Sequence, residues 1–217
     1  LFTNGSSSGN DGYGIYAYWL SNGNQIDNFT LQGNNKSGIY LFDSYYYTIE
    51  NCNSSLNGGD GYYLMTTGSA IIDCISLNNA KTGFNLYHTD TTAIRNCTII
   101  GNAEEGMSLK YSSDNVFTGN LIINNEQGIR VILKSSGNLF YSNIFIHNFA
   151  RIQSSDDGVN YWNTSTKGNY WSDHISPDEN QDGIIDVPYN IDGGAGAVDH
   201  FPLVKPPVTP VPDHRKF

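Results

Sequence analysis

The chain has 217 residues, of which 11 are basic and 21 are acidic, and it carries a formal net charge of −10. This charge argues against the phosphate backbone of a nucleic acid as a partner, because that backbone attracts clusters of lysine and arginine. No apolar run approaches the roughly 20 residues of a membrane-spanning helix, so we expect no membrane span in this sequence.

Residues 1–12 are rich in glycine, serine and asparagine, a composition typical of turns. We expect them to form the tail of an incomplete coil. Because no capping element precedes this coil, we expect the sequence to be an excerpt or a processed piece of a longer protein.

From residue 14 onward the sequence repeats every 22 to 24 residues, and three columns of residues keep this period. The glycine column contains Gly14, Gly38, Gly61, Gly83, Gly106 and Gly128. The asparagine column contains Asn10, Asn34, Asn57, Asn79, Asn102, Asn125 and Asn148. The third column, five residues before the asparagines from Asn34 onward, contains Phe29, Cys52, Cys74, Cys97, Asn120 and Asn143. A period of roughly 20–50 residues indicates a solenoid.

The content of each repeat predicts which solenoid forms. Short runs of alternating apolar and polar residues are separated by Asn, Gly, Ser and Asp, as in strands joined by turns. A leucine-rich repeat has a similar period, but it needs a leucine consensus and often a helix, and the sequence has no helical periodicity. We therefore predict an all-β, right-handed parallel β-helix whose coils stack about 4.8 Å apart. The residues one and three positions after each glycine are predicted to point inward and form the core.

The asparagine column is predicted to be structural. Asparagine tolerates the left-handed backbone of a sharp corner, and its side-chain amide can bond the same residue one coil away. Cys52, Cys74 and Cys97 share one inward column, so we expect buried free thiols. A disulfide between stacked neighbours is sterically conceivable but leaves one cysteine over. Zinc is disfavoured, because parallel side chains in one column do not converge tetrahedrally.

The outward positions of the first four coils predict an aromatic face that ends in two cations. The predicted ligand-binding residues are Tyr16, Tyr18, Tyr40, Phe42, Tyr63, Tyr87, Lys110 and Arg130. An exposed aromatic surface of this extent usually marks a contact site, and the coil spacing of about 4.8 Å is close to the length of one sugar unit. We expect the rings to stack on sugars and the cations to pair with uronate or sulfate groups. The alternatives are that another domain or subunit covers the face, or that tyrosine is only a good strand former.

An enzyme is a competing hypothesis. A polysaccharide lyase needs a base and a cation that neutralises the uronate, and His88, Lys110 and Arg130 are the catalytic candidates on or beside the aromatic face. The spacing argues against them, since Asp43 and His88 share an outward column two coils, or about 10 Å, apart. No two carboxylates lie on adjacent coils of this face at the separation that a glycosidase uses. The sequence therefore favours a non-enzymatic role.

The period ends after Asn148. We predict coils over residues 1–150, an irregular cap over residues 151–204 and a proline-rich linker over residues 205–217. The cap contains an acidic loop with the spacing of an EF-hand-type calcium site, and Gly183 stands at its turn position. The predicted Ca²⁺ ligands are Asp178, Asn180, Asp182, Ile184 through its carbonyl, and Asp186. Tyr189 replaces the bidentate glutamate that usually ends such a loop, and the alternative is a solvated acidic turn.

This C-terminal part resembles a known family. The segments GNYWSD at 168–173, DVPYNI at 186–191 and DHFPL at 199–203, together with the acidic loop, are similar to the C-terminal signature of NosD-like parallel β-helix proteins. Such proteins are common at archaeal cell surfaces. The resemblance implies an extracellular setting and often an association with carbohydrate, and it brings no catalytic motif.

The leading hypothesis is a secreted cell-surface module, structural or adhesive, that presents a binding face to a polysaccharide or a cell-surface glycoprotein. One alternative is a polysaccharide lyase or hydrolase that acts on acidic glycans. Another is a self-assembling surface-layer or filament subunit, because uncapped coil ends offer strand edges to a second molecule. Asn-X-Ser/Thr sites such as Asn28 and Asn96 give weak support to a secreted glycoprotein.

Overall fold

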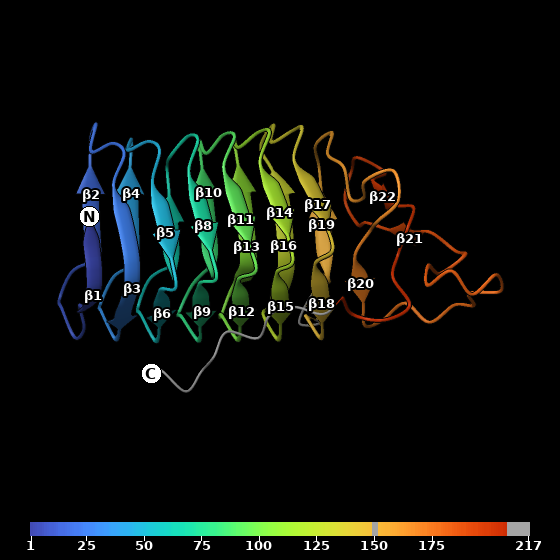
Figure 1. Ribbon diagram of the computed structural model, residues 1–217, viewed down its shortest axis with the longest axis horizontal. Helices are drawn as coiled ribbons and strands as arrows, with labels where there is room; N and C mark the ends of the chain where they lie inside the picture. Colours follow the sequence, from blue (N-terminus) through green and yellow to red (C-terminus); the bar gives the residue numbers. More distant parts are fainter. Residues whose placement is uncertain (149–151, 208–217) are drawn as a thin grey trace.

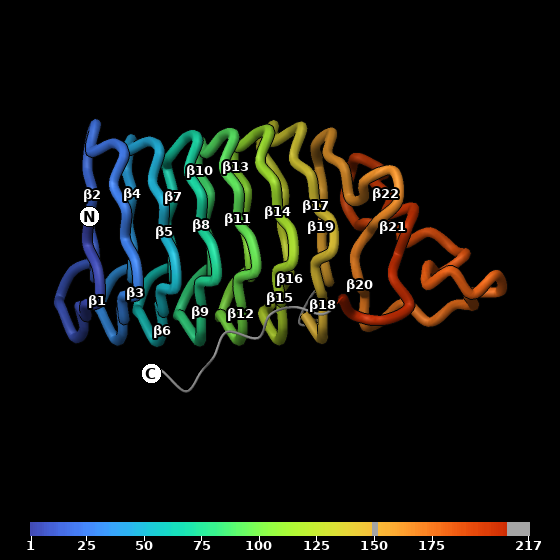
Figure 2. Tube along the Cα trace, viewed as in Figure 1, coloured from blue at the N-terminus to red at the C-terminus, as the bar shows by residue number. Residues whose placement is uncertain are grey.

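The computed structural model describes residues 1–148 and 152–207 and has the form of an elongated parallel β-helix (Figure 1). It has about 7 turns of about 23 residues each. Within the described ranges, no helix is long and apolar enough to span a membrane. The coils stack along one axis and a less regular segment closes the C-terminal end (Figure 2). The predicted boundary at residue 150 and most of the predicted linker lie outside the described residues.

Two faces of the helix belong to one thirteen-stranded sheet, because the long strand β3 pairs with β5 through its first half and with β6 through its second. The strands of this sheet are β1 (Phe2–Ser6), β3 (Gln25–Gln32), β5 (Thr48–Glu50), β6 (Asn53–Ser55), β8 (Ala70–Ile72), β9 (Ile75–Leu77), β11 (Ala93–Arg95), β12 (Thr98–Ile100), β14 (Val116–Thr118), β15 (Leu121–Ile123), β17 (Leu139–Tyr141), β18 (Ile144–Ile146) and β20 (Tyr170–Trp171). Its pairings are parallel from coil to coil, as the repeat period predicts.

The third face is a seven-stranded parallel sheet. Its strands are β2 (Ile15–Tyr18), β4 (Ile39–Phe42), β7 (Tyr62–Leu64), β10 (Phe84–Tyr87), β13 (Glu105–Lys110), β16 (Gln127–Ile132) and β19 (Ser154–Asp156). The register places Tyr40 beside Tyr63 and Tyr63 beside Asn85. Side chains that stand two positions after each glycine therefore form one straight outward column.

The core lies where the sequence predicts it. The inward residues of β4, β7, β10, β13 and β16 are fully buried: Ile39, Leu41, Tyr62, Leu64, Phe84, Leu86, Met107, Leu109, Ile129 and Val131. In the first coil, Ile15 and Ala17 are only partly buried. Cys52, Cys74 and Cys97 are buried free thiols, as expected.

The asparagine column is a hydrogen-bonded ladder, which confirms the predicted side-chain bonds. The Nδ2 atom of each asparagine donates to Oδ1 of the next one along the chain, as in Asn79 to Asn102 at 3.0 Å and Asn102 to Asn125 at 2.9 Å. Two shorter ladders run from Asn115 through Asn138 to Asn160 and from Asn120 through Asn143 to Asn169. Since nearly all these amides are buried, each rung satisfies polar groups that water cannot reach.

The left-handed backbone expected at the ladder asparagines lies instead one residue earlier. The residue just before each of six ladder asparagines has φ between 52° and 65°: Gly33, Leu56, Asn78, Gly101, Asn124 and His147. The corner is made before the ladder residue, which keeps an ordinary backbone conformation. The backbone N–H and Nδ2 of Asn102 can then both donate to Oδ1 of Asn125.

The cap closes the last coil with buried aromatic rings and two buried carboxylates. Trp162 stacks on Phe140 with ring centroids 4.3 Å apart, and Trp171 stacks on Phe145 at 4.2 Å. The Trp162 indole donates to Asp156 and the Trp171 indole donates to Asp199. The antiparallel strands β21 (Tyr189–Asn190) and β22 (Val198–Asp199) complete the cap. Burial raises the pKa of Asp199 above its ordinary value.

Candidate functional site

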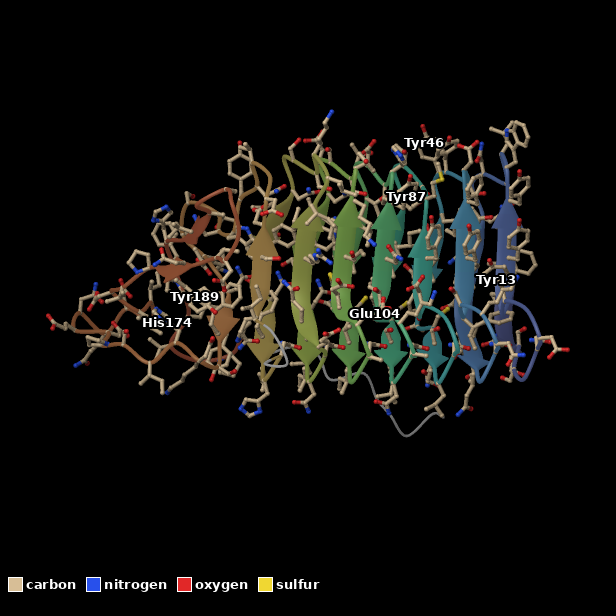
Figure 3. The ribbon with its side chains drawn as sticks, turned by 180° about the vertical axis from the view of Figure 1, so that it is seen from behind. Tyr13, Tyr46, Tyr87, Glu104, His174 and Tyr189 are labelled. Atoms are coloured by element: carbon tan, nitrogen blue, oxygen red, sulfur yellow. The ribbon has the colours of Figure 1, made fainter. Side chains whose placement is uncertain are left out.

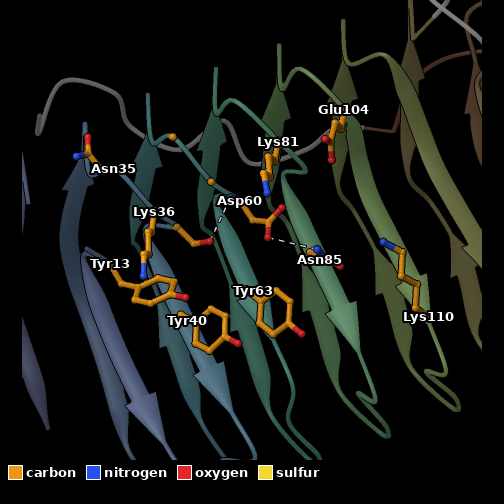
Figure 4. A pocket seen from close by; sticks show the side chains of 13 residues that line it. Tyr13, Asn35, Lys36, Tyr40, Asp60, Tyr63, Lys81, Asn85, Glu104 and Lys110 are labelled. Carbon is orange, nitrogen blue, oxygen red and sulfur yellow. Dashed lines mark hydrogen bonds between the residues drawn. The ribbon is translucent and has the colours of Figure 1, made fainter. Parts of the chain in front are cut away.

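A groove of about 520 Å³ opens on the outer side of the seven-stranded sheet, at the beginnings of β4, β7, β10 and β13 (Figure 4). Its lining includes three tyrosines, three lysines, two carboxylates and two amides: Tyr13, Tyr40, Tyr63, Lys36, Lys81, Lys110, Asp60, Glu104, Asn35 and Asn85. These residues come from several successive coils, so the solenoid register brings them together.

A glycine pair in the groove lining lets the backbones of two coils approach closely. Gly58 and Gly59 lie in the turn before β7, against the turn of the preceding coil. A Cβ added to Gly58 would lie 2.5 Å from the Asn35 carbonyl oxygen, and one added to Gly59 would lie 2.7 Å from the Ser37 nitrogen. Only glycine allows so close an approach of two backbones.

The predicted aromatic face is present, but most of its rings stack on one another. The ring centroids of Tyr40 and Tyr63 are 4.4 Å apart, and those of Tyr18 and Phe42 are 5.3 Å apart. Tyr13, which the sequence analysis did not single out, joins the stack 4.5 Å from Tyr40. The faces of Tyr40 are therefore covered by neighbouring rings.

Tyr63 ends this stack. One face of its ring covers Tyr40, and the other turns toward the next coil, where Asn85 stands in register and supplies no ring (Figure 4). Burial raises the pKa of the Tyr63 hydroxyl above its ordinary value, so the phenol is neutral at physiological pH. Tyr63 thus offers an aromatic face inside the groove.

Asp60 is the least exposed charged group of the groove, at 6% relative exposure. Its Oδ1 accepts a hydrogen bond from the Thr82 N–H at 3.2 Å, and its Oδ2 accepts one from Asn85 Nδ2 at 3.3 Å. Burial raises the pKa of this carboxyl to about 6. The two hydrogen bonds and the charge of Lys81 lower the pKa, but their effects are smaller. Nearby Glu104 adds to the increase. Asp60 is therefore able to hold a proton near neutral pH.

Glu104 lies in the same groove but is exposed. Thr82 Oγ1 is 3.4 Å from Glu104 Oε2 and 3.0 Å from Glu105 Oε2. Glu105 is in turn paired with Arg130, with 3.3 Å between Nη1 and Oε1. Arg130, predicted as a ligand-binding cation, is thus held by a carboxylate beside the groove and is absent from its lining.

The other sequence candidates lie either in the groove or at the C-terminal end of β10. Lys110 lines the groove, as do Tyr40 and Tyr63. Tyr87 and His88 lie at the far end of β10, away from Glu104, where His88 stacks on Tyr111 with ring centroids 4.9 Å apart (Figure 3). Tyr87 contacts both rings edge to face. His88 is not part of the groove lining, although its backbone N–H donates to the carbonyl of Lys110 at 3.0 Å.

Sequence reasoning missed Asp60, Glu104, Lys36 and Lys81. They lie in the turns before the strands, whereas the sequence search considered the outward positions within the strands. The sequence analysis considered only carboxylates on adjacent coils of this face, whereas Asp60 and Glu104 line one groove from positions two coils apart. A search of the positions just before each glycine could have found them.

The first coil carries the most exposed rings of the aromatic face. Tyr16 and Tyr18 are about half exposed, at 54% and 50%, and Trp19 is exposed at 63%. Strand β2 forms an edge of its sheet in the described part of the chain. Self-association through this coil stays a prediction.

The acidic loop of the cap is curled around its own carboxylates. Asp178 accepts hydrogen bonds from the backbone N–H groups of Asp182 and Gly183, at 3.1 and 3.0 Å. Asp186 Oδ2 accepts one from the Glu179 N–H at 2.8 Å. Among the described residues, no three His, Cys, Asp or Glu side chains are grouped closely enough to hold a metal ion. The calcium site stays a prediction.

Known proteins share this architecture. Residues 3–175 match the family described as periplasmic copper-binding protein (NosD). No curated protein matches the sequence. The solved structure of the periplasmic alginate epimerase AlgG is similar with a TM-score of 0.57 and 22% identity, over 78% of this chain and 37% of that one. The A-module of the Azotobacter vinelandii mannuronan C-5 epimerase AlgE6 is similar with a TM-score of 0.56 and 17% identity, over 80% of this chain and 47% of that one. The chain spans less than half of either structure, and these identities show a shared fold alone.

Proposed function

The chain belongs to the NosD family, and on this premise we propose that it is a periplasmic or extracellular β-helix protein that binds polysaccharide in the groove beside Tyr63. The observation that supports this most directly is the position of Tyr63 at the end of the ring stack, with no ring on its second face, within a groove that carries Lys36, Lys81 and Lys110. An aromatic face accepts the apolar face of a sugar, and the ammonium groups accept its anionic substituents.

The groove favours an acidic polysaccharide over a neutral one. Its three lysines outnumber its two carboxylates, and Asp60 is protonated in part near neutral pH. Lys36 Nζ lies 5.0 Å from the centre of the Tyr13 ring, which holds this cation at one end of the groove. We propose a uronate-containing chain as the ligand. A finer proposal is that the protein presents this groove at the cell surface, to a free polysaccharide or to a glycan of a surface glycoprotein.

Copper, which the family description names, does not fit the residues of this chain. Copper in proteins is held by histidine, cysteine and methionine, and in the described part of the chain no histidines and cysteines are grouped so that they could hold it. The cysteine column is buried, and burial raises the pKa of Cys74, which disfavours the thiolate that a metal needs. Met107 is buried in the core. No part of the proposed function rests on copper.

Replacing the ring at the end of the stack tests the proposal. Tyr63→Ala is expected to weaken binding to polygalacturonate or alginate by about tenfold, because one well-placed aromatic contact contributes more than about 1 kcal/mol. Binding is measured by isothermal titration calorimetry or affinity electrophoresis, with dextran as the neutral polysaccharide.

Tyr16→Ala is the matched control, since Tyr16 belongs to the same stack, is 54% exposed and does not line the groove. We expect this variant to bind as the parent does. Equal losses in both variants would contradict a site at Tyr63, and parent protein that binds neither acidic polymer would remove the proposed function.

We also propose that the acidic loop at Asp178–Asp186 binds Ca²⁺. The support is the spacing of its oxygen-bearing side chains together with the backbone curl around Asp178. Calcium is expected to raise the melting temperature of the parent by a few degrees, because a ligand that binds only the folded state stabilises it. Magnesium is expected to raise it by less. Asp182→Ala should remove this response, whereas Glu179→Ala, at a position that is not a predicted ligand, should retain it. The same melting temperature with and without calcium in the parent would end this proposal.

A further inference from the structure

Two carboxyl groups with unlike surroundings line the same groove. Asp60 is nearly buried, and its raised pKa of about 6 lets it hold a proton in mildly acidic solution. Glu104 is exposed on the rim. A pair in which one carboxyl is protonated and the other ionised is what acid–base hydrolysis of a glycoside requires.

The separation of the two groups is set by the coils. Both contact Thr82, which lies on the coil between them: Asp60 Oδ1 accepts from its backbone N–H and Glu104 Oε2 lies beside its hydroxyl. Residues two coils apart lie about 10 Å apart along the axis, and each carboxyl group reaches to within hydrogen-bond distance of the threonine between them, at 3.2 Å for Asp60 and 3.4 Å for Glu104. Inverting glycosidases place their carboxyl groups roughly 6.5–9.5 Å apart, whereas retaining enzymes need about 5 Å.

Resting on the proposed function, we propose that the groove also cleaves what it binds, with Asp60 as general acid and Glu104 as general base of an inverting glycoside hydrolase that acts on an acidic polysaccharide. A water molecule beside Glu104 attacks the anomeric carbon and gives its proton to Glu104. The bond from the anomeric carbon to the glycosidic oxygen breaks, and that oxygen takes the proton of Asp60. One water is consumed and one new reducing end forms, with inverted configuration.

The surrounding residues support these roles. Lys81 lies near both carboxylates, and its charge lowers the pKa of Asp60 while Glu104 raises it (Figure 4). Asn85 Nδ2 and the Thr82 N–H fix the Asp60 carboxyl in one orientation. Tyr63 supplies the face on which one sugar ring packs, and Lys110 lies on the other side of Asn85 from Tyr63, where it can pair with a uronate (Figure 4). Glu105 is excluded as the base because Arg130 pairs with it outside the groove lining.

The test measures binding and cleavage separately on polygalacturonate and on alginate. The parent is expected to bind at least one of them and to release reducing ends from it. Release should be faster below about pH 6 than above, because Asp60 must be protonated.

Asp60→Asn and Glu104→Gln are each expected to lower the initial rate by at least about 100-fold while the dissociation constant changes little. Since Glu104 is exposed, its variant is expected to fold as the parent does. Glu50→Gln, on the thirteen-stranded sheet, is the control that should keep the parent rate.

The outcomes distinguish this inference from the proposed function. Parent protein that binds an acidic polymer without releasing reducing ends overturns the hydrolase and leaves the binding function in place. Parent protein that binds neither polymer removes both. Products with retained configuration by NMR, unsaturated products that absorb in the ultraviolet, or full activity in both carboxylate variants would each overturn the assignment of Asp60 and Glu104.

Discussion

Asp199→Ala is expected to lower the free energy of unfolding by about 3–5 kcal/mol, and to loosen the cap before the coils. Asp199 is fully buried, and its carboxylate accepts hydrogen bonds from the Trp171 indole at 3.0 Å, from the Asn169 N–H at 2.7 Å and from the Phe201 N–H at 3.0 Å. Alanine leaves these donors without a partner in a place that water does not reach. It also leaves a cavity beneath the stacked Trp171 ring.

The measurement is chemical denaturation followed by tryptophan fluorescence, combined with hydrogen exchange across residues 152–207. Asp157→Ala is the matched control, because Asp157 is an exposed carboxylate of the same cap that accepts one bond from the Gly194 N–H. Its effect should stay within about 1 kcal/mol. Equal effects of the two substitutions would show that the buried carboxylate does not organise the cap.

Asn102→Ala is expected to cost about 3 kcal/mol, because it breaks the ladder in its middle. Asn102 Oδ1 accepts from the Asn79 N–H at 3.1 Å and from Asn79 Nδ2 at 3.0 Å, and Asn102 Nδ2 donates to Asn125 at 2.9 Å. All three residues are buried. Alanine therefore removes one rung and also leaves the donors of the preceding rung unsatisfied.

Asn10→Ala provides the control from the same ladder. Asn10 is the exposed first rung and donates to Asn34 at 2.7 Å, so water can replace what the substitution removes. We expect a loss below about 1 kcal/mol. Comparable losses at Asn10 and Asn102, measured by urea denaturation, would mean that the ladder contributes no more inside the solenoid than at its end.

The repeat period was sufficient to predict the fold. The glycine, asparagine and inward apolar columns each obey one physical requirement in every coil, so six copies of the same constraint could be read together. The left-handed corner was misplaced by one residue because very different residues, such as Leu56 and Gly101, occupy it. Backbone conformation there follows from the stacking, and the residue types alone do not indicate it.

The groove was harder to predict because it depends on differences between coils. Asp60 shares its column with Thr82 and Glu105, which have unrelated chemistry, so the column carries no repeated signal. The elevated pKa of Asp60 comes from burial, which only the packed structure determines. The pairing of Arg130 with Glu105 likewise depends on the coil register. Tyr40 and Tyr63 were predicted as outward residues. Their stacking on each other, after which only Tyr63 has a ring face turned into the groove, was not predicted.

The ladders have a direction, and this bears on how proteins of this kind change length. Every amide-to-amide bond runs from Nδ2 toward the C-terminal end. The last rungs of the two shorter ladders, Asn160 and Asn169, donate to the carboxylates of Asp156 and Asp199, which only accept. A whole coil gained by gene duplication would take its place in such a chain of amides without disturbing either end. The loss of part of a coil would leave a donor facing no acceptor. Evolution can therefore lengthen or shorten this solenoid in steps of one complete coil, while the terminating carboxylates stay the same.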